Sequence, residues 1–120
     1  MSLEKFIKQP VSYFRFTHDY VKLGAESGTT IRFSLKDDKN YSKRVGDIVW
    51  MIHSNKKFKA VIEKIDKVRI MDIPFEILRA DVAPFQIKKH LDFLNIIQSF
   101  YDFPLTLDSK MYVIYWRRVE

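Results

Sequence analysis

The chain has 120 residues, a length that fits one domain and leaves little room for a second. It contains no cysteine, which excludes disulfides and thiolate metal sites and suits a reducing cytoplasm. No apolar run approaches the ~20 residues that a membrane-spanning helix needs. We therefore expect one cytoplasmic domain over residues 1–120, with residues 1–10 as an N-terminal extension and no contact with a membrane.

Lys and Arg together number 21 against 15 Asp and Glu, which gives a formal net charge of +6. This excess favours a polyanionic partner, because binding of RNA or DNA releases condensed counterions. A basic surface that only keeps the protein in solution is the alternative explanation. Aromatic residues make up 15% of the chain, and rings pack well on sheets. The composition therefore predicts a strand-rich domain with a basic surface.

Two strands and a short helix are expected in the first third of the chain. Residues 11–16 (VSYFRF) place both Phe side chains on one apolar face, and residues 18–23 can form a helix. Residues 29–35 alternate between apolar and polar side chains, which is the period of a half-buried strand. The polar face of this strand carries Thr30 and Arg32.

The remaining strands follow a charged loop at residues 36–44. Residues 48–52 form a nearly continuous apolar strand after a turn. Residues 58–69 form a long alternating strand, and a strand of this length usually bends or contains a bulge. Residues 111–116 are apolar on both faces, so we expect this last strand to be central in the sheet.

Two helices are expected between the last two strands. A short helix opens at Ile73-Pro74 and runs to about residue 80, because proline is tolerated in a first helical turn. A longer helix follows Pro84 and ends before Pro104. Its predicted buried stripe has the helical spacing of three to four and consists of Ile87, Leu91, Leu94, Ile97 and Tyr101.

The sequence contains no motif of a metal site or of a nucleophilic enzyme. His18, His53 and His90 are not at metal-ligand spacing, and HExxH is absent. The chain also lacks the GxSxG elbow and the glycine-rich phosphate loops. Asp37 and Asp38 are adjacent in a loop, which is typical of a solvated turn. We expect neither a metal nor a cofactor.

Basic residues crowd the loops at one predicted end of the sheet. They are Lys36, Lys39, Lys43, Arg44, Lys56, Lys57 and Lys59. Tyr41, Trp50 and Phe58 lie among them in the sequence. Cations that bind phosphates beside rings that stack on bases are what single-stranded nucleic acid requires. Ordinary solvated loop charge is the alternative explanation.

Thr30 and Arg32 leave their strand in the same direction, after a flexible glycine loop. A hydroxyl and a guanidinium on one face can bind a carboxylate, a phosphate or a base edge. The alternative is an Arg that packs on the sheet and pairs with a local carboxylate.

The order of several short segments forms one pattern over residues 11–118. A glycine loop runs into Thr30-Ile31-Arg32, and a basic loop leads to residues 45–49 (VGDIV). The long strand is followed by an acidic helix, an amphipathic helix ending in Tyr101, and a terminal strand with residues 112–114 (YVI). This pattern resembles the ASCH family of the PUA-like superfamily.

The resemblance implies an α+β fold: a β-barrel of five or six mostly antiparallel strands, with flanking helices and a cleft beside the Thr-x-Arg strand. It also implies binding of RNA or modified nucleosides. Some bacterial members are small amidohydrolases that deacylate acetylcytidine, using a Lys, a Thr and a Glu. Their Thr corresponds to Thr30. Their Lys falls on Ser27, or on Glu26 with one extra loop residue. Their Glu falls near Asp81, with Glu76 as another candidate.

Two hypotheses for the function follow. The first is a nucleic-acid- or nucleotide-binding module, for RNA above all, that is a monomer or weak homodimer. Its ligand-binding residues would be Arg32, Lys36, Lys43, Arg44, Trp50, Lys56, Lys57 and Tyr101. The second is a small amidohydrolase acting on an acylated or modified nucleoside. Its catalytic candidates are Thr30, Asp81 and Ser27, with Lys36 or Lys22 supplying the missing amine. A protein-interaction adaptor without a pocket is a third interpretation.

Overall fold

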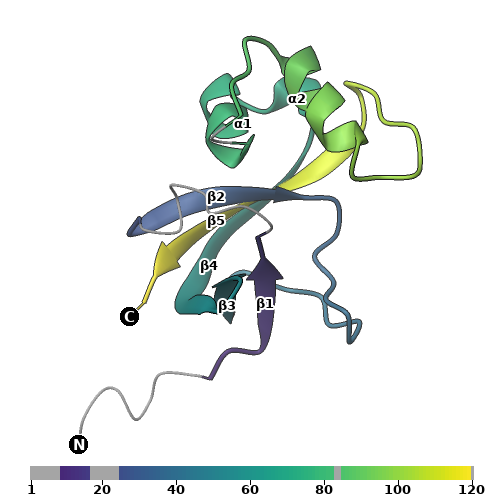
Figure 1. Cartoon of the computed structure of the whole chain (residues 1–120). Helices are drawn as coiled ribbons and strands as arrows, with labels where there is room; N and C mark the ends of the chain where they lie inside the picture. The colour runs from purple at the N-terminus through teal and green to yellow at the C-terminus, as the bar shows by residue number, and fades with distance from the viewer. Residues whose placement is uncertain (1–8, 17–24, 83–84, 120) are drawn as a thin grey trace, which may run out of the picture.

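A computed structural model describes residues 9–16, 25–82 and 85–119 of the chain (Figure 1). Its strands are β1 (Ser12–Arg15), β2 (Ser27–Arg32), β3 (Ile48–His53), β4 (Lys56–Arg69) and β5 (Lys110–Arg118). Between β4 and β5 lie a 3₁₀ turn, η3 (Ile70–Asp72), and the helices α1 (Phe75–Val82) and α2 (His90–Gln98). The α+β class and the predicted strands are confirmed. The predicted helix over residues 18–23 lies outside the described residues.

The strands form one sheet in the order β1-β3-β4-β5-β2. β1 pairs with β3 in parallel, and the β3–β4, β4–β5 and β5–β2 pairs are antiparallel. The predicted closed barrel is therefore wrong: the sheet has five described strands and two edges, β1 and β2, with no ladder between them in the described residues. The physical reason is that the two edges meet through a side chain: Arg32 Nη2 at the end of β2 donates to the Arg15 oxygen at the end of β1, in place of a backbone ladder.

β4 is the long central strand, and its pairing changes part-way along. The register with β5 shifts between Ile62 and Lys64, which marks a β-bulge. The predicted irregularity in this strand is confirmed. A bulge bends a strand and increases its twist, so β4 can pair with β3 at one end and with β5 along most of its length. β5 pairs with β4 and β2, which confirms its predicted central position.

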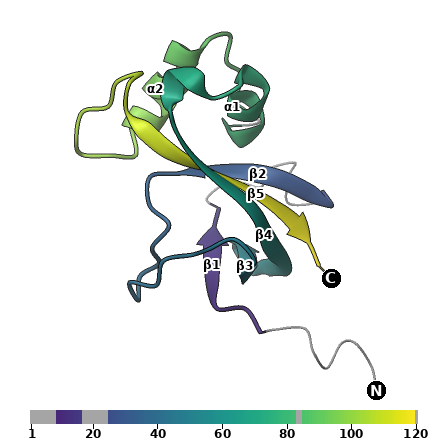
Figure 2. The ribbon, with the colours of Figure 1, turned by 180° about the vertical axis from the view of Figure 1, so that it is seen from behind.

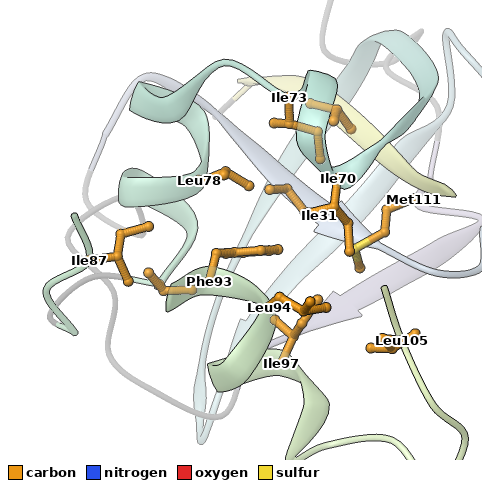
Figure 3. Packing of buried hydrophobic residues seen from close by; sticks show 12 residues of the cluster. Ile31, Ile70, Ile73, Leu78, Ile87, Phe93, Leu94, Ile97, Leu105 and Met111 are labelled. Carbon is orange, nitrogen blue, oxygen red and sulfur yellow. The ribbon is translucent and has the colours of Figure 1, made fainter. Parts of the chain in front are cut away.

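The two faces of the sheet carry two separate cores. Both helices lie on one side of β2 and β5, whereas β1 and β3 lie on the other side, as the two opposite views show (Figures 1 and 2). On the helix side, Leu78 of α1 and Phe93 of α2 are directed toward Ile31 of β2 (Figure 3). The other core has Phe14, Val49, Ile62, Ile114 and Trp116 among its buried residues.

The longer helix begins later than the sequence pattern indicates. α2 starts at His90 because the Asp92 carboxylate accepts hydrogen bonds from the backbone N–H groups of Lys88 and Lys89, which caps the first turn. Leu91, predicted to be buried, is 43% exposed, and Phe93 fills the core in its place. No helix of the described residues is long and apolar enough to cross a membrane.

The pairing of β2 with β5 depends on a glycine. Gly28 is the cross-strand partner of Trp116, whose indole lies over the glycine backbone. A Cβ atom at position 28 would come 2.9 Å from Cζ2 of this indole. Trp116 is 1% exposed, and its Nε1 has no hydrogen-bond partner among the described residues. The indole ring is therefore tightly packed in the interior and cannot move far from Gly28.

Gly28→Ala should lower the free energy of unfolding by about 1–3 kcal/mol, the usual cost of overpacking a core. Chemical denaturation measures this change. Ser27→Ala, at the exposed neighbouring position, is the control and should change stability by less than about 0.5 kcal/mol. Trp116→Phe removes the indole atoms that the new methyl would meet, so Gly28→Ala should cost less in that background. An equal cost in both backgrounds would contradict the proposed clash.

Candidate functional site

A cavity of about 250 Å³ opens between β2, the end of β1 and the two helices. Thr30 and Arg32 line it from β2, Asp81 lines it from α1, and Tyr101 lines it from the segment after α2. We call it the main cavity. The structure thus brings together four of the residues that the sequence singled out. The rest of its wall is mostly apolar and consists of Arg15, Phe16, Ile31, Val82, Phe85, Ile96, Ile97, Phe100 and Met111.

The Arg32 side chain forms part of the wall where β2 ends. Its Nε donates to Thr30 Oγ1 over 3.1 Å, and its Nη2 donates to the backbone oxygen of Arg15 over 2.8 Å. The guanidinium also lies over the rings of Phe14 and Phe16, at 5.2 and 5.0 Å from their centroids. Such planar stacking and forked donation are properties of Arg that Lys does not share. Arg32 is half-buried, so it is fixed in place at the cavity.

Thr30 is deeper in the site than the alternation of its strand indicates. Its residue is only 1% exposed, because the polar face of β2 is turned toward the other strands instead of toward solvent. Asp81 Oδ1 accepts a hydrogen bond from the Ile31 backbone over 3.1 Å, which ties α1 to β2. Both side chains therefore support the wall as well as lining it.

Tyr101 closes the aromatic side of the main cavity. Its ring meets that of Phe33 edge-on, with 4.7 Å between centroids. Burial raises the pKa of its hydroxyl above the ordinary value, Arg32 opposes this shift, and Asp81 adds to it. The hydroxyl is therefore a neutral hydrogen-bonding group at physiological pH.

A second cavity, of about 190 Å³, lies on the other side of Arg32. Arg15 and Arg32 line both cavities, so the two are neighbours. The remaining residues of the second cavity are Tyr13, Phe14, Ser34, Lys36, Asp37, Asp38 and Lys43. Predicted ligand-binding residues Lys36 and Lys43 are therefore beside Arg32 but outside the main cavity.

Lys43 is buried although it belongs to a charged loop. The residue is 4% exposed, and its Nζ donates to the backbone oxygen of Leu35 over 3.3 Å. The ammonium lies 4.6 Å from the centroid of the Phe14 ring and 5.9 Å from that of Tyr13. Burial lowers the pKa of this amine, the Asp37 carboxylate opposes the shift, and Arg32 adds to it.

The loop that carries Lys43 is tied to β1. Ser12 Oγ donates to Asp37 Oδ2 over 2.7 Å, and the Tyr13 hydroxyl donates to Asp38 Oδ1. Asp37 Oδ1 also accepts from the backbone N–H groups of Lys39 and Tyr41. The Ser12 hydrogen bond is the main cause that lowers the pKa of Asp37. These contacts fix residues 37–41 of the loop against β1.

The other predicted site residues do not join these cavities. Ser27 is exposed at the start of β2, and Arg44 is exposed at the turn before β3. Trp50 lies on the face of β3 opposite the buried Val49 and Met51, so it points away from the core that contains these two residues. Lys57 Nζ lies over its ring at 4.3 Å, and Lys56 is the neighbouring exposed residue. Glu76 lies in the first turn of α1.

The sequence analysis missed three residues of the main cavity: Arg15, Phe85 and Phe100. Arg15 is exposed at the end of β1. Phe85 and Phe100 are 46% and 61% exposed, which is unusual for such large rings. Phe100 lies inside the predicted helix, next to its apolar stripe, so the sequence pattern favoured a buried core position over a place at a cavity.

The histidines that the structure describes are bound to backbone. His53 Nδ1 lies 3.0 Å from the Phe16 oxygen, and His90 Nε2 lies 2.7 Å from the Ile73 oxygen. Within the described ranges, no three His, Asp or Glu side chains come together in a way that could bind a metal ion.

No protein-family model matches the sequence. The uncharacterized protein MJ0364 of Methanocaldococcus jannaschii is 41% identical over 107 residues, which cover 87% of this chain and 93% of that protein. The chain belongs to the same family as this archaeal protein. Among solved structures, the crystal structure of hypothetical protein PH0355 is similar, with a TM-score of 0.59 and 16% identity over 90% of this chain and 98% of that one. This likeness shows a shared fold alone.

Lys43→Met should raise the free energy of unfolding at pH 7 by about 1 kcal/mol or more, because an apolar side chain of similar length replaces a buried charge. The lowered pKa sets the pH dependence. Between this pKa and the ordinary value of 10.5, the unfolded chain binds a proton that the folded chain does not. The free energy of unfolding of the natural protein therefore rises with pH in this window. The difference in stability between Lys43→Met and the natural protein should become smaller there.

Urea denaturation at several pH values measures the difference. Lys39→Met is the matched control, because Lys39 is exposed in the same loop, and it should give no such pH-dependent difference. A variant that is less stable than the natural protein at pH 7 would mean that the ring contacts of the ammonium outweigh its burial.

Proposed function

We propose that this chain binds RNA or a nucleotide-like ligand, with one base in the main cavity. The observation that carries the proposal is the composition of its wall, which combines the polar side chains of Arg32, Thr30 and Asp81 with the rings of Phe85 and Phe100. Hydrogen-bonding groups can read the edge of a base, and rings can stack on its face. Together these are the contacts through which proteins recognise unstacked bases.

The size of the main cavity supports a small, flat ligand. Cavities that take drug-sized molecules usually measure ~300–1,000 Å³. The main cavity, at about 250 Å³, is slightly smaller and fits a single ring system better. The exposed rings of Phe85 and Phe100 would then cover a base at the cavity mouth.

The net charge of +6 supports an anionic ligand. We assign the attraction of the phosphate backbone first to the cations beside Arg32. Trp50, Lys56 and Lys57 form a separate patch on the β3–β4 hairpin. In this proposal they contact RNA that continues beyond the bound base, together with Arg44.

We further propose that the chain is a divergent member of the ASCH family, with a PUA-like sheet. Support comes from the order of its elements and from the cavity beside Thr30 and Arg32. The helices flank the sheet as that family implies, although the barrel is open. We expect the protein to act as a monomer or weak homodimer.

Phe100→Ala should weaken binding of a short single-stranded RNA about tenfold, because stacking on one base contributes ~1–3 kcal/mol. Fluorescence anisotropy measures the affinity at several salt concentrations. The affinity of the natural protein should fall steeply as salt rises, since the lysines release counterions from the RNA.

Leu91→Ala is the matched control for Phe100→Ala. Leu91 is also exposed and apolar, lies on α2 and does not line the main cavity, so RNA affinity should stay unchanged. Equal losses in the two variants, or RNA binding that does not respond to salt, would count against the proposal.

A small amidohydrolase is the second candidate, and one observation favours it. Thr30 and Asp81, which the family resemblance assigns to catalysis, share the main cavity. However, Thr30 Oγ1 already accepts from Arg32, Ser27 lines neither cavity, and Lys36 lies in the second one. The described part of the cavity wall has no amine to activate a nucleophile, which makes binding the better-supported function.

Incubation with acetylcytidine tests this candidate, with acetate release as the measurement. If the candidate is right, the natural protein releases acetate and Thr30→Val, which keeps the shape of the side chain, abolishes the release. Acetylcytidine that stays intact, or a Thr30→Val variant with full activity, would eliminate catalysis by Thr30.

A further inference from the structure

The second cavity contains a buried ammonium with incomplete hydrogen bonding. Lysine carries three N–H donors, and Lys43 uses one of them, at 3.3 Å to the Leu35 oxygen. Its residue is 4% exposed, so water reaches it poorly. No ion pair of Lys43 forms within the part of the chain that the structure describes. A buried charge of this kind is costly unless an acceptor completes its coordination.

The nearby carboxylates are engaged elsewhere. Both oxygens of Asp37 are hydrogen-bonded, Oδ2 to Ser12 and Oδ1 to the backbone at residues 39 and 41. Asp38 accepts from the Tyr13 hydroxyl. These acidic groups hold the loop to β1, and each already has a partner. The charge of Asp37 favours the protonated amine of Lys43, but neither carboxylate forms an ion pair with it in the described residues, so an anion in the cavity could still complete its coordination.

Cations from three parts of the chain surround the second cavity. Arg15 comes from β1, Arg32 from β2, and Lys36 and Lys43 from the loop between β2 and β3. Guanidinium groups bind phosphate oxygens through forked donors, and a lysine adds a point charge. The two arginines also line the main cavity, where the proposed base would bind.

We propose that the second cavity binds the phosphate group of a nucleotide whose base occupies the main cavity. This inference rests on the proposed function and adds the class of ligand: a phosphorylated nucleoside, either free or as part of an RNA strand. Arg32 lies between the base and the phosphate in this arrangement, and Lys43 donates to phosphate oxygens. The ligand then supplies the acceptors that the buried ammonium lacks.

The pKa of Lys43 agrees with this role. Burial lowers it in the free protein, and a phosphate beside the amine would raise it again, because an opposite charge favours the protonated form. A position that disfavours charge without ligand and accepts it with ligand is typical of a binding site. The ammonium also lies over the rings of Tyr13 and Phe14, which line the same cavity as Lys43.

The experiment compares cytidine with its 3′- and 5′-monophosphates and with a short cytidine oligonucleotide, using isothermal titration calorimetry on the full chain. At least one monophosphate or the oligonucleotide should bind roughly tenfold or more tightly than cytidine, because hydrogen bonds to charged groups are strong. Lys43→Met should remove this gain, so that the phosphorylated ligands bind this variant no more tightly than cytidine does.

Two further variants keep the test independent of folding. Arg15→Gln changes an exposed side chain that lines the cavity, and it should also reduce the gain from phosphate. Lys39→Gln removes the same charge from an exposed position of the same loop that lines neither cavity. It should leave the gain unchanged, which separates a specific site from general attraction.

Each outcome decides the inference. A Lys43-dependent gain for the monophosphates assigns the cavity to a terminal phosphate, and one for the oligonucleotide alone assigns it to the RNA backbone. Cytidine binding without any gain overturns the inference and leaves the proposed function standing. If neither cytidine nor its phosphorylated forms bind, the base in the main cavity is not cytosine, and inorganic phosphate decides the inference. NMR shifts around Lys43 that Lys43→Met abolishes support the anion site, and their absence overturns it.

Discussion

The guanidinium of Arg32 joins the two edges of the sheet. It extends from the last residue of β2 to the backbone oxygen of Arg15, the last residue of β1. No strand pairing connects these edges in the described residues, so one side chain replaces the backbone ladder of a closed barrel. Because the same group stacks on Phe14 and Phe16, it also fixes the wall that separates the two cavities. The two cavities and the junction of the strand edges therefore share the same contact.

Polar groups in the interior concentrate where the sheet fails to close. Thr30 and Lys43 are both nearly inaccessible to solvent. The core that contains Phe14 and Trp116 consists instead of aliphatic and aromatic residues. Burying such groups reduces stability unless partners satisfy them. Apolar side chains would be sufficient to shield an open strand edge from solvent. The choice of a hydroxyl, an ammonium and a guanidinium at this point therefore favours a role in binding.

The sequence predicts the elements of this fold better than their curvature. Alternation correctly places Thr30 and Arg32 on one face of β2, but it does not tell that this face is interior, since the bend comes from the bulge in β4. The burial of Lys43 depends on contacts of its loop with Ser12 and Tyr13, far away in the sequence. The outward position of Trp50 was not readable either, because its strand is nearly continuous in apolar residues and shows no alternation.

The division of the basic residues explains why charge alone does not locate the site. Lys57 and Lys59 lie over the Trp50 ring on the outer face of the hairpin, where solvent screens their charge. Lys43 is buried and Arg32 is half-buried beside the second cavity, where their charges are less screened and act more strongly on a ligand. A net charge can draw an anion toward the whole surface, but selection requires cations held in a fixed arrangement. In this chain the strand edges and the loop between β2 and β3 provide that arrangement.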